Sequence, residues 1–399
     1  MKVLVLNSGS SSIKFQLFNM EEERVLAKGL VERIGIEDSA IEYENDNGQE
    51  VEKDMDIPNH KEGIEHVIEM LLDPEVGVLE DIDEINAVGH RVVHGGEKFA
   101  HSTLIDDEVI EKIEEVTPLA PLHNPHNLSG IKVCKELLPG KPQVGVFDTA
   151  FHQTMPEEAY TYAIPYEYYE EYGVRRYGFH GTSHKFVSKR CANMMEKDIE
   201  DLKIITCHLG NGASIAAVDG GESVDTSMGM TPLEGLVMGT RSGDIDPAII
   251  PFLMDKEDLD TKEIDNILNK ESGLLGVSGI SNDSRDVRQA AHDGNHRAAL
   301  ADKVFNYRVR KYIGSYIAAL NGVDAVVFTG GIGENAAGVR EHILEKMDNI
   351  GFDLDREANK VRGEEREITT PDSDIKAFVI PTNEELVIAR DTKEIVENQ

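Results

Sequence analysis

Short apolar runs that predict strands flank two similar turns, one near the start of the chain and one near its middle. The first run, Val3–Leu6, leads into the turn Ser8–Ser12 and then into a segment where apolar and polar residues alternate. The second run, Ile204–Leu209, leads into Gly210–Ser214 and another apolar segment. Alternation with a period of two is typical of strands. The two segments align without gaps, with the last serine of each turn superimposed, and predict a duplicated strand–turn–strand unit.

The rest of the chain alternates apolar strands with helical patterns. Further strands are predicted at Ala87–Val93, Gln143–Phe147, Asp324–Phe328 and Ala377–Ile380. Helices are predicted at Lys61–Leu72, Asp106–Val116, Asn127–Leu138, Thr261–Lys270, Arg285–His292 and His296–Leu320. Gly181 and Thr182 argue against a helix directly after His180. Strands that alternate with helices indicate an α/β protein. A length of 399 residues exceeds one ordinary core, so we expect two domains.

The charge balance limits the partners that this surface can bind. The formal net charge is −35, from 75 acidic and 40 basic residues. Such a surface repels nucleic acid and anionic membranes, so we expect neither as a partner. Adaptation to a salty cytoplasm and ordinary acidic drift both remain open as its origin. No apolar run approaches the roughly 20 residues of a membrane span, the N-terminal apolar run is too short for a signal peptide, and the three cysteines lack disulfide or zinc spacing. A cytoplasmic protein is predicted.

Three turns combine small residues, bare backbone N–H groups and polar side chains, as phosphate-binding loops do. They are Ser8–Ser12, Gly210–Ser214 and Gly330–Asn335, and none contains a P-loop. Gly331–Ala336 fits the dinucleotide pattern G-x-G-x-x-A, although a plain tight turn between strand and helix is the more frequent explanation of a single match. Because three such turns occur in one chain, we interpret them as sites for nucleotide phosphates. A nicotinamide-dependent dehydrogenase would rest on the third turn alone.

A few basic side chains stand in unusual surroundings. Arg91 lies in an apolar strand and Arg241 in a glycine-rich loop, where a guanidinium could clamp phosphoryl or carboxyl oxygens or form a structural ion pair. His180 could donate to a developing phosphoryl charge or be a satisfied core histidine. Its spacing from His184 would suit a metal only on a helix, and no H-E-x-x-H motif accompanies the pair.

Two acidic residues follow strands at positions where open α/β sheets place catalytic carboxylates. Asp148 comes directly after Gln143–Phe147, and Glu384 comes shortly after Ala377–Ile380. Nucleotide-bound Mg²⁺ needs only one or two carboxylates. We expect these two to serve it, with solvated surface carboxylates as the alternative.

Seven segments together resemble the acetate and propionate kinase family: Asn7–Lys14, Gly89–Gly96, Phe147–His152, Tyr177–His184, His208–Ser214, Thr231–Arg241 and Gly330–Asn335. They occur in family order over essentially the whole chain. The resemblance implies a duplicated ribonuclease-H-like fold with two lobes, as in actin-like ATPases, and ATP between the lobes. Residues 1–150 with a returning helix at 386–399 would form the acyl-substrate lobe, and residues 151–385 the nucleotide lobe. It also implies a homodimer.

The resemblance implies a role for each matched residue. Phosphate ligands would be Ser10, Ser12, Lys14, His208, Leu209, Gly210, Asn211 and Gly212. The adenosine would be bounded by Asp283, Ser284, Arg285, Gly331, Ile332, Gly333, Glu334 and Asn335. The transferred phosphoryl group would be flanked by Arg91, Arg241 and His180, with Asp148 as the catalytic carboxylate. Metal ligands would be Asn7 and Glu384. Arg91, Val93, Leu122 and Pro232 would surround the acetate.

One position departs from the family pattern. Ser284 stands between Asp283 and Arg285, where the family usually has a bulky apolar residue. A serine removes a surface on which the base could pack, so we expect looser or less purine-selective nucleotide binding.

The implied reaction is reversible transfer of a phosphoryl group from ATP to acetate, giving ADP and acetyl phosphate, with Mg²⁺ as cofactor and Mn²⁺ as an alternative ion. Acetate is already ionised at pH 7, so no general base is required. Asp148 should therefore orient the metal or an arginine. Propionate remains the alternative substrate, because one methylene changes affinity by only about 1–3 kcal/mol. An actin- or Hsp70-like ATP-driven binding protein is the alternative from another class, and it would lack the segments around Arg91 and Pro232.

Overall fold

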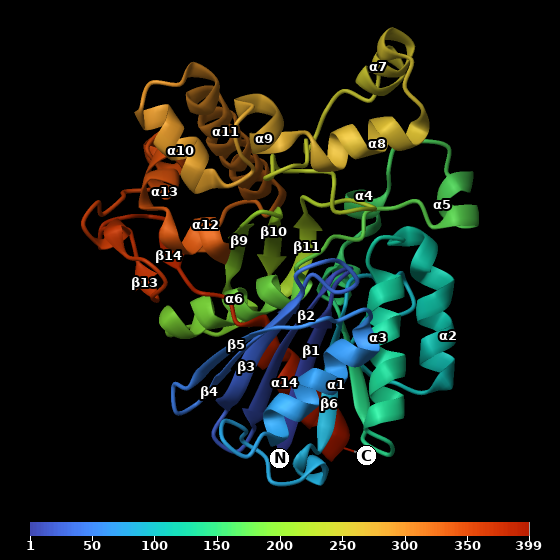
Figure 1. The fold of residues 1–399 in the computed structure, drawn as a ribbon. Helices are drawn as coiled ribbons and strands as arrows, with labels where there is room; N and C mark the ends of the chain where they lie inside the picture. The colour runs from blue at the N-terminus through green and yellow to red at the C-terminus, as the bar shows by residue number, and fades with distance from the viewer. Residues whose placement is uncertain (399) are drawn as a thin grey trace. The chain divides into compact units, whose positions relative to one another are not determined.

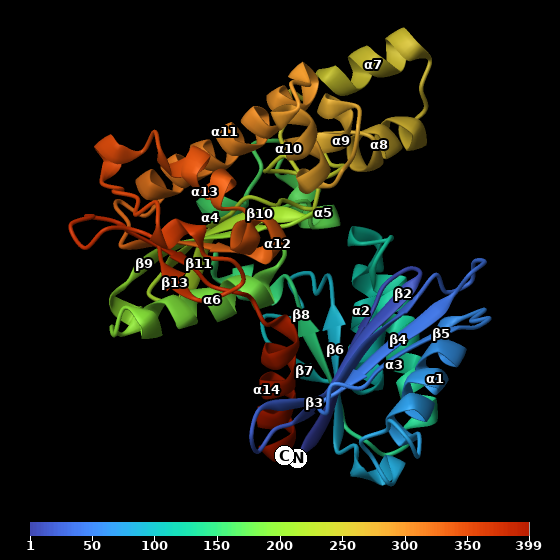
Figure 2. The same ribbon diagram turned by 60° about the vertical axis from the view of Figure 1, so that its left-hand side comes forward.

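The computed structural model describes residues 1–398, which form two compact units. Unit 1 consists of Met1–Phe151 and the C-terminal segment from Asn383, and unit 2 consists of His152–Thr382. Each unit contains one mixed sheet with helices on both faces (Figures 1 and 2). In this part of the chain no helix is both long enough and apolar enough to span a bilayer.

The sheet of unit 1 has the strand order β5-β4-β3-β2-β1-β6-β8-β7. Its strands are β1 (Lys2–Ser8), β2 (Ser12–Asn19), β3 (Arg24–Glu32), β4 (Ala40–Asn45), β5 (Glu50–Asp54), β6 (Ala87–Val92), β7 (Thr103–Leu104) and β8 (Gln143–Phe147). Its helices are α1 (His60–Leu72), α2 (Asp107–Val116), α3 (Asn124–Leu137) and α14 (Glu384–Glu397). Strands β1, β2 and β3 are antiparallel, whereas β6 and β8 run parallel to β1.

The sheet of unit 2 has the order β11-β10-β9-β12-β14-β13. Its strands are β9 (Lys203–Leu209), β10 (Ala213–Asp219), β11 (Glu222–Thr226), β12 (Ala325–Thr329), β13 (Arg366–Glu367) and β14 (Lys376–Val379). Its helices are α4 (Glu157–Tyr160), α5 (Glu167–Tyr172), α6 (Gly181–Met194), α7 (Ile249–Glu257), α8 (Thr261–Lys270), α9 (Gly273–Ser278), α10 (Ser284–His292), α11 (His296–Ala319), α12 (Gly330–Asn335) and α13 (Ala337–Leu344).

The two sheets repeat one pattern. In each, an antiparallel three-stranded meander is joined through its first strand to two parallel strands, β6 and β8 in unit 1 and β12 and β14 in unit 2. This repeated order is the duplicated ribonuclease-H-like fold of actin-like ATPases. The predicted fold class is therefore confirmed.

The gapless alignment of the two turns is wrong by one residue. Ser8 pairs with Ile13 across the first turn, which leaves four residues between them, whereas Leu209 pairs with Ala213, which leaves three. One strand of each hairpin can be superimposed without a gap, but not both.

Apolar residues on both faces of the unit 1 sheet build two cores. Helices α1 and α3 cover one face, where Phe15, Ile64 and Leu71 are buried. Helix α14 covers the other face, where Ile388 packs with Val3 and its neighbours (Figure 2). In unit 2, both α6 and α11 contact β9 of the sheet, and α6 also contacts β12 whereas α11 also contacts β10.

The predicted helices form, with small shifts at their ends. The largest shift is at α3, which begins at Asn124 rather than Asn127 because Pro125 occupies its first turn, where a missing N–H costs nothing. The expectation of no helix after His180 is wrong. Helix α6 begins at Gly181, and His180 is its N-cap with a left-handed φ of 55°.

Candidate functional site

Three predicted residues lie at one edge of the unit 1 sheet, where its parallel strands end. Leu6 pairs with His90, so Asn7 and Arg91 follow at the same level of β1 and β6. Arg91 in turn pairs with Val146 of β8, which ends just before Asp148. Parallel strands bring their carboxyl ends to one edge, and ligands of open α/β sheets bind there.

Arg91 and Asp148 form a bidentate ion pair. The Nε atom of Arg91 donates to Oδ1 of Asp148 at 3.1 Å, and Nη2 donates to Oδ2 at 2.7 Å. Asp148 is only 1% exposed. Although burial lowers the pKa of Arg91, the carboxylates of Asp148 and Glu384 raise it by more, so the guanidinium stays charged. Asp148 therefore fixes the plane and direction of the Arg91 head group.

Glu384 joins this pair from the first turn of α14. Asn383 caps the helix by accepting from the Leu386 N–H, which sets the start of the helix at Glu384. Oε2 of Glu384 lies 3.9 Å from Nε of Arg91, is buried, and has no hydrogen-bond partner within residues 1–398. Burial raises the pKa of Glu384 to about 7, and the Asp148 carboxylate adds to the rise while Arg91 opposes it.

The residues at this edge fit a divalent cation bound together with substrate. Two carboxylates and one guanidinium leave the cluster with a net charge of −1 when Glu384 is ionised. An acetate or phosphate anion would meet repulsion there, and a divalent cation would remove it. The described residues contain no group of three or more His, Cys, Asp or Glu side chains that could hold a metal unaided. Mg²⁺ takes one or two carboxylates and completes its shell with phosphates and water, and the carboxylates of Asp148 and Glu384 could serve it in this way.

Hydrogen bonds from Asn127 and His60 hold the turn after β1 in place, and the sequence did not predict either residue for this role. Nδ2 of Asn127 donates to the Ser8 carbonyl at 2.8 Å, and Oδ1 of the same side chain accepts from the Val93 N–H at 3.0 Å. Nε2 of His60 hydrogen-bonds to the Gly9 carbonyl at 2.6 Å. Asn127 thus couples the turn to the end of β6.

The predicted phosphate ligands of this turn lie at the surface of unit 1. Ser10 is exposed, Ser12 is half-buried, and Lys14 is exposed and forms an ion pair with Glu385. Glu385 was not predicted, and nothing in the sequence pattern separates it from the many other acidic residues. Lys14 would have to leave Glu385, or share it, to reach a phosphate.

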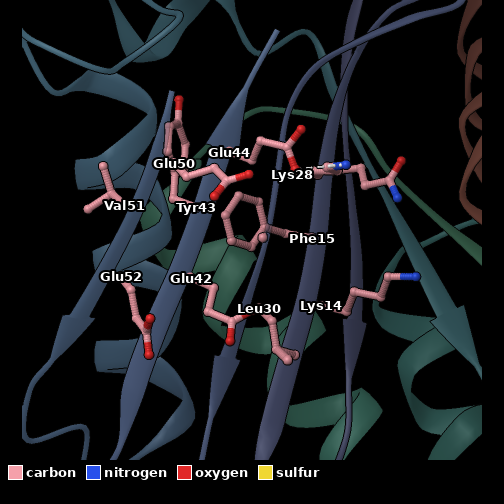
Figure 3. A pocket seen from close by; sticks show the side chains of 12 residues that line it. Lys14, Phe15, Lys28, Leu30, Glu42, Tyr43, Glu44, Glu50, Val51 and Glu52 are labelled. Atoms are coloured by element: carbon pink, nitrogen blue, oxygen red, sulfur yellow. Dashed lines mark ion pairs between the residues drawn. The ribbon is translucent and has the colours of Figure 1, made fainter. Parts of the chain in front are cut away.

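A hollow on the outer face of the same sheet shows where a nucleotide does not fit. Two rows of side chains cross strands β2 to β5 in register (Figure 3). Phe15 and Tyr43 come from the positions between the two rows and belong to the buried core. The rows are Lys14, Leu30, Glu42 and Glu52, and Gln16, Lys28, Glu44 and Glu50. Four carboxylates against two lysines would repel phosphates.

The predicted acetate pocket is divided between the units. Val93 lies half-buried after β6, and Leu122 is 59% exposed in the loop before α3. Pro232 belongs to unit 2. No single unit holds all three residues, so the pocket stays a prediction.

In unit 2, the predicted residues His180 and Arg241 lie beside Gly212, and His208 stacks on His180. A Cβ atom placed on Gly212 would lie 3.6 Å from Nε2 of His180 and 3.6 Å from Nη1 of Arg241. The rings of His180 and His208 stack with centroids 4.3 Å apart. Nδ1 of His208 is hydrogen-bonded to the Ser183 hydroxyl at 2.8 Å. Burial lowers the pKa of Arg241, with no acidic partner contributing to the shift. The turn therefore presents a guanidinium and an imidazole at the same place.

The turn residues themselves are held by a close backbone approach. The Gly239 N–H donates to the Asn211 carbonyl at 2.9 Å, and a Cβ on Gly239 would overlap Oδ1 of Asn211. Gly210 donates its N–H to the Gly212 carbonyl at 3.1 Å, while Leu209 is buried at the end of β9. A glycine at position 239 is what lets the loop carrying Arg241 lie against this turn.

The structure brings together the two segments predicted to bound adenosine. Ser284 and Ile332 line one small cavity, together with Leu274, Val287, Arg288, Asp302, Phe305 and Val339. Asp283 caps α10 by accepting from the Arg285 N–H, and its carboxylate also pairs with the exposed Arg285 side chain. Ser284 and Ile332, one from each segment, therefore line the same cavity, and the role of both in adenosine binding stays a prediction.

The Gly330–Asn335 segment forms the short helix α12 instead of an open turn. Gly330 has a φ of 75°, and its N–H donates to Oε1 of Glu334, which also accepts from the Thr382 N–H at 3.2 Å. Glu334 therefore has a structural task. Gly331 is exposed with open space beside it, Gly333 packs against β9, and Nδ2 of Asn335 donates to the Gly331 carbonyl.

Arg340 is a further residue that the sequence did not reveal. It is fully buried and donates to the carbonyls of Gly333, Asn359 and Val361 and to the Asn359 side chain. Burial lowers its pKa to about 10. Arg340 fixes the end of α12 from the core side, and an arginine in a helical pattern looks like an ordinary surface residue.

The repeated order of strands in the two sheets defines an actin-like ATPase fold. Comparison with known proteins narrows this class. The family model described as "Acetokinase family" matches residues 2–390, and the chain belongs to this family.

Individual members of the family are similar to this chain over its full length. The chain is 69% identical over 398 residues to an acetate kinase of Halothermothrix orenii, covering 100% of both chains, and 61% identical over 399 residues to one of Methanosarcina thermophila, covering 100% of this chain and 98% of the relative. Among solved structures, it matches Porphyromonas gingivalis acetate kinase with a TM-score of 0.95 and 50% identity, covering 99% of each chain. A Francisella tularensis propionate kinase matches with a TM-score of 0.93 and 45% identity, also covering 99% of each.

Proposed function

We propose that this chain catalyses the reversible transfer of the γ-phosphoryl group of ATP to acetate, producing ADP and acetyl phosphate. The observation that carries the proposal is the Arg91–Asp148–Glu384 cluster in a chain of the acetokinase family. An arginine held rigidly by a buried carboxylate presents its remaining N–H groups to a second anion. That second anion is the acetate carboxylate or the phosphoryl group in transfer.

Each residue then has a task that needs no general base. The acetate carboxylate is ionised at neutral pH and attacks directly. Arg91, Arg241 and His180 would donate hydrogen bonds to the oxygens that gain charge during in-line transfer. Asp148 would act as the residue that orients Arg91, in agreement with its two hydrogen bonds to the guanidinium.

Mg²⁺ would be held by Asn7 and Glu384, with Asp148 orienting the metal or Arg91, and when bound it would neutralise charge on the triphosphate. Mn²⁺ has similar ligand preferences and is proposed as a substitute. The nucleotide phosphates would lie against Ser10, Ser12, Lys14 and the turn His208–Gly212. The adenosine would lie against Asp283–Arg285 and Gly331–Asn335. A homodimer and a cytoplasmic location stay predictions from the family resemblance.

The test is an acyl phosphate assay, in which hydroxylamine traps acetyl phosphate as a hydroxamate. We expect product only when ATP, acetate and a divalent cation are all present. Arg91→Ala should lower kcat by about 10²- to 10³-fold. Arg390→Ala is the matched control, because Arg390 makes the same bidentate contact with Glu23 on the surface. Equal activity of the two variants would contradict the proposal.

Propionate is the second candidate acceptor, favoured by the similarity to a propionate kinase structure. Values of kcat/KM for acetate, propionate and butyrate separate the two. We expect acetate to have the highest value, because the relatives of highest identity among those compared are acetate kinases. A value for propionate above that for acetate would reverse the assignment.

A further inference from the structure

A buried chain of hydrogen bonds in unit 2 leads to His180. Oγ1 of Thr206, on β9, lies 2.7 Å from Nδ1 of His184, on α6. Nε2 of His184 lies 2.7 Å from Oγ of Ser214, on β10, and that oxygen lies 2.9 Å from Nδ1 of His180. Thr206, His184 and Ser214 are all fully buried, so water does not compete for these bonds.

The chain can hold its protons in only a few ways, because His184 is neutral. Burial lowers the pKa of His184 well below its usual value, and the neighbouring His152 and His208 act in the same direction. A neutral imidazole has one N–H donor and one acceptor nitrogen, and each hydroxyl has one proton. A donor at one end therefore fixes the direction of every bond that follows.

Thr206 is the donor at the start of the hydrogen-bond chain. Within residues 1–398, its hydroxyl has His184 as its hydrogen-bond partner and no other. If the hydroxyl donates to Nδ1, the His184 proton sits on Nε2 and is donated to Ser214, whose own proton then points to Nδ1 of His180. The opposite direction would leave the Thr206 proton buried without an acceptor, which is unfavourable.

Donation from Thr206 through His184 and Ser214 toward His180 sets the tautomer of His180. With Nδ1 accepting from Ser214, the ring proton of neutral His180 must sit on Nε2. That atom lies toward Gly212 and Arg241, at the turn proposed to hold the phosphates. The backbone at His180 is in the left-handed region, with φ at 55°, and its carbonyl accepts the His184 N–H at 3.0 Å, so the two histidines are also coupled through the first turn of α6.

We propose that Thr206, His184 and Ser214 are positioning residues that hold His180 as the Nε2–H tautomer, ready to donate a hydrogen bond to the phosphoryl group in transfer. This inference rests on the proposed function. A donor prepared in advance costs no reorganisation when charge develops in the transition state. The other tautomer would turn an acceptor nitrogen toward the phosphoryl oxygens and repel them.

Two isosteric variants test the chain. Thr206→Val removes the donor at its start, and Thr226→Val is the matched control. Thr226 is equally buried on β11, which lies two strands away from β9 in the same sheet. Its hydroxyl donates to the Ile215 carbonyl at 3.1 Å, and within residues 1–398 it makes no hydrogen bond to a histidine. We expect Thr206→Val to lower kcat about 10-fold and Ser214→Ala about 10- to 100-fold, with KM values for ATP and acetate within about threefold of wild type. Thr226→Val should keep kcat within about twofold.

The tautomer itself can be read from wild-type protein carrying ¹⁵N-labelled histidine. Long-range ¹H–¹⁵N correlation spectra distinguish Nε2–H from Nδ1–H, and the His180 signals are those missing from the His180→Ala spectrum. We expect Nε2–H in the wild type and a loss of this preference in Thr206→Val but not in Thr226→Val.

Two results would overturn the proposal: a wild-type His180 protonated at Nδ1, or equal kcat values for the two threonine variants. If Ser214→Ala does not fold, the comparison of Thr206→Val with Thr226→Val and the wild-type spectrum still test the proposal. If the wild type makes no acyl phosphate, the proposed function fails, while the spectra of wild type and the two threonine variants still accept or reject the hydrogen-bond chain.

Discussion

Replacing Asp148 by asparagine tests the role of the carboxylate that holds Arg91. The variant keeps the size and one oxygen of the side chain but removes its charge. One of the two hydrogen bonds, at 3.1 and 2.7 Å, is retained, and the new NH₂ group faces a guanidinium that also donates. A hydrogen bond to a charged group contributes about 1.5–3 kcal/mol, and the second carboxylate near Arg91 limits the loss. We expect a destabilisation of about 2 kcal/mol.

The expected assay results follow from this geometry. Unit 1 should unfold at a temperature lower by about 4–8 °C, given about 2–4 °C per kcal/mol for a unit of its size. Arg91 would lose its fixed direction, so kcat should fall about 100-fold. The Asp148 carboxylate raises the pKa of Glu384, so its removal should let Glu384 ionise at lower pH and shift the Mg²⁺ dependence of the rate.

The control is Glu23→Gln, which changes the partner of Arg390 in a bidentate contact of the same type. Both side chains of that pair are more than 40% exposed, so the change should alter stability by less than about 1 kcal/mol and leave kcat unchanged. Near-normal turnover of Asp148→Asn with unchanged Mg²⁺ dependence would refute both an arginine-orienting and a metal-orienting role.

Three further predictions concern single side chains. Because the native pKa of Glu384, about 7, lies above its unfolded value, the wild type loses stability as pH rises from about 4.5 through 7, by on the order of 3 kcal/mol. Glu384→Gln should therefore melt higher relative to wild type at pH 8 than at pH 5 in metal-free calorimetry, and a pH-independent difference would contradict this. Arg340→Met leaves two buried carbonyls and one partly buried carbonyl without their donor, so it should cost at least about 3 kcal/mol of stability and raise KM for ATP through the displacement of Gly333. An unchanged KM for ATP would show that α12 takes no part in nucleotide binding. Ser284→Phe should lower the equilibrium dissociation constant for ATP more than those for GTP and ITP. Unchanged dissociation constants would show that Ser284 does not contact the nucleotide.

The fold could be predicted because each element carries a local signal. The alternation of apolar and polar residues around the first turn correctly predicted β1 and β2. The amphipathic pattern of residues 261–270 correctly predicted α8, which Asp260 caps. The errors arose where local signals compete. Gly181 has a poor helix propensity, but it stands at the first position of α6, where the entropy cost is offset by packing of the helix on β9 and β12.

The candidate site was predictable where a residue type contradicts its surroundings. Arg91 in an apolar strand and the glycines at 210 and 212 were conspicuous for this reason. Functional or structural residues whose type is ordinary for their surroundings could not be recognised from the sequence. Glu385 is one acid among many, and Arg340 fits the helical pattern of a surface arginine, yet its side chain is fully buried.

The hydrogen-bond chain behind His180 shows why spacing alone could not reveal the rest. His180 and His184 are four residues apart, a spacing that suggests a shared metal, and the structure gives them a shared serine instead. Ser214 lies 30 residues beyond His184 and becomes its neighbour only because β10 pairs with β9 beside α6. The hydroxyl of Thr206 orders the protons of this chain from the strand interior. If the proposal holds, a serine of the second turn determines which nitrogen of His180 faces the proposed phosphate site.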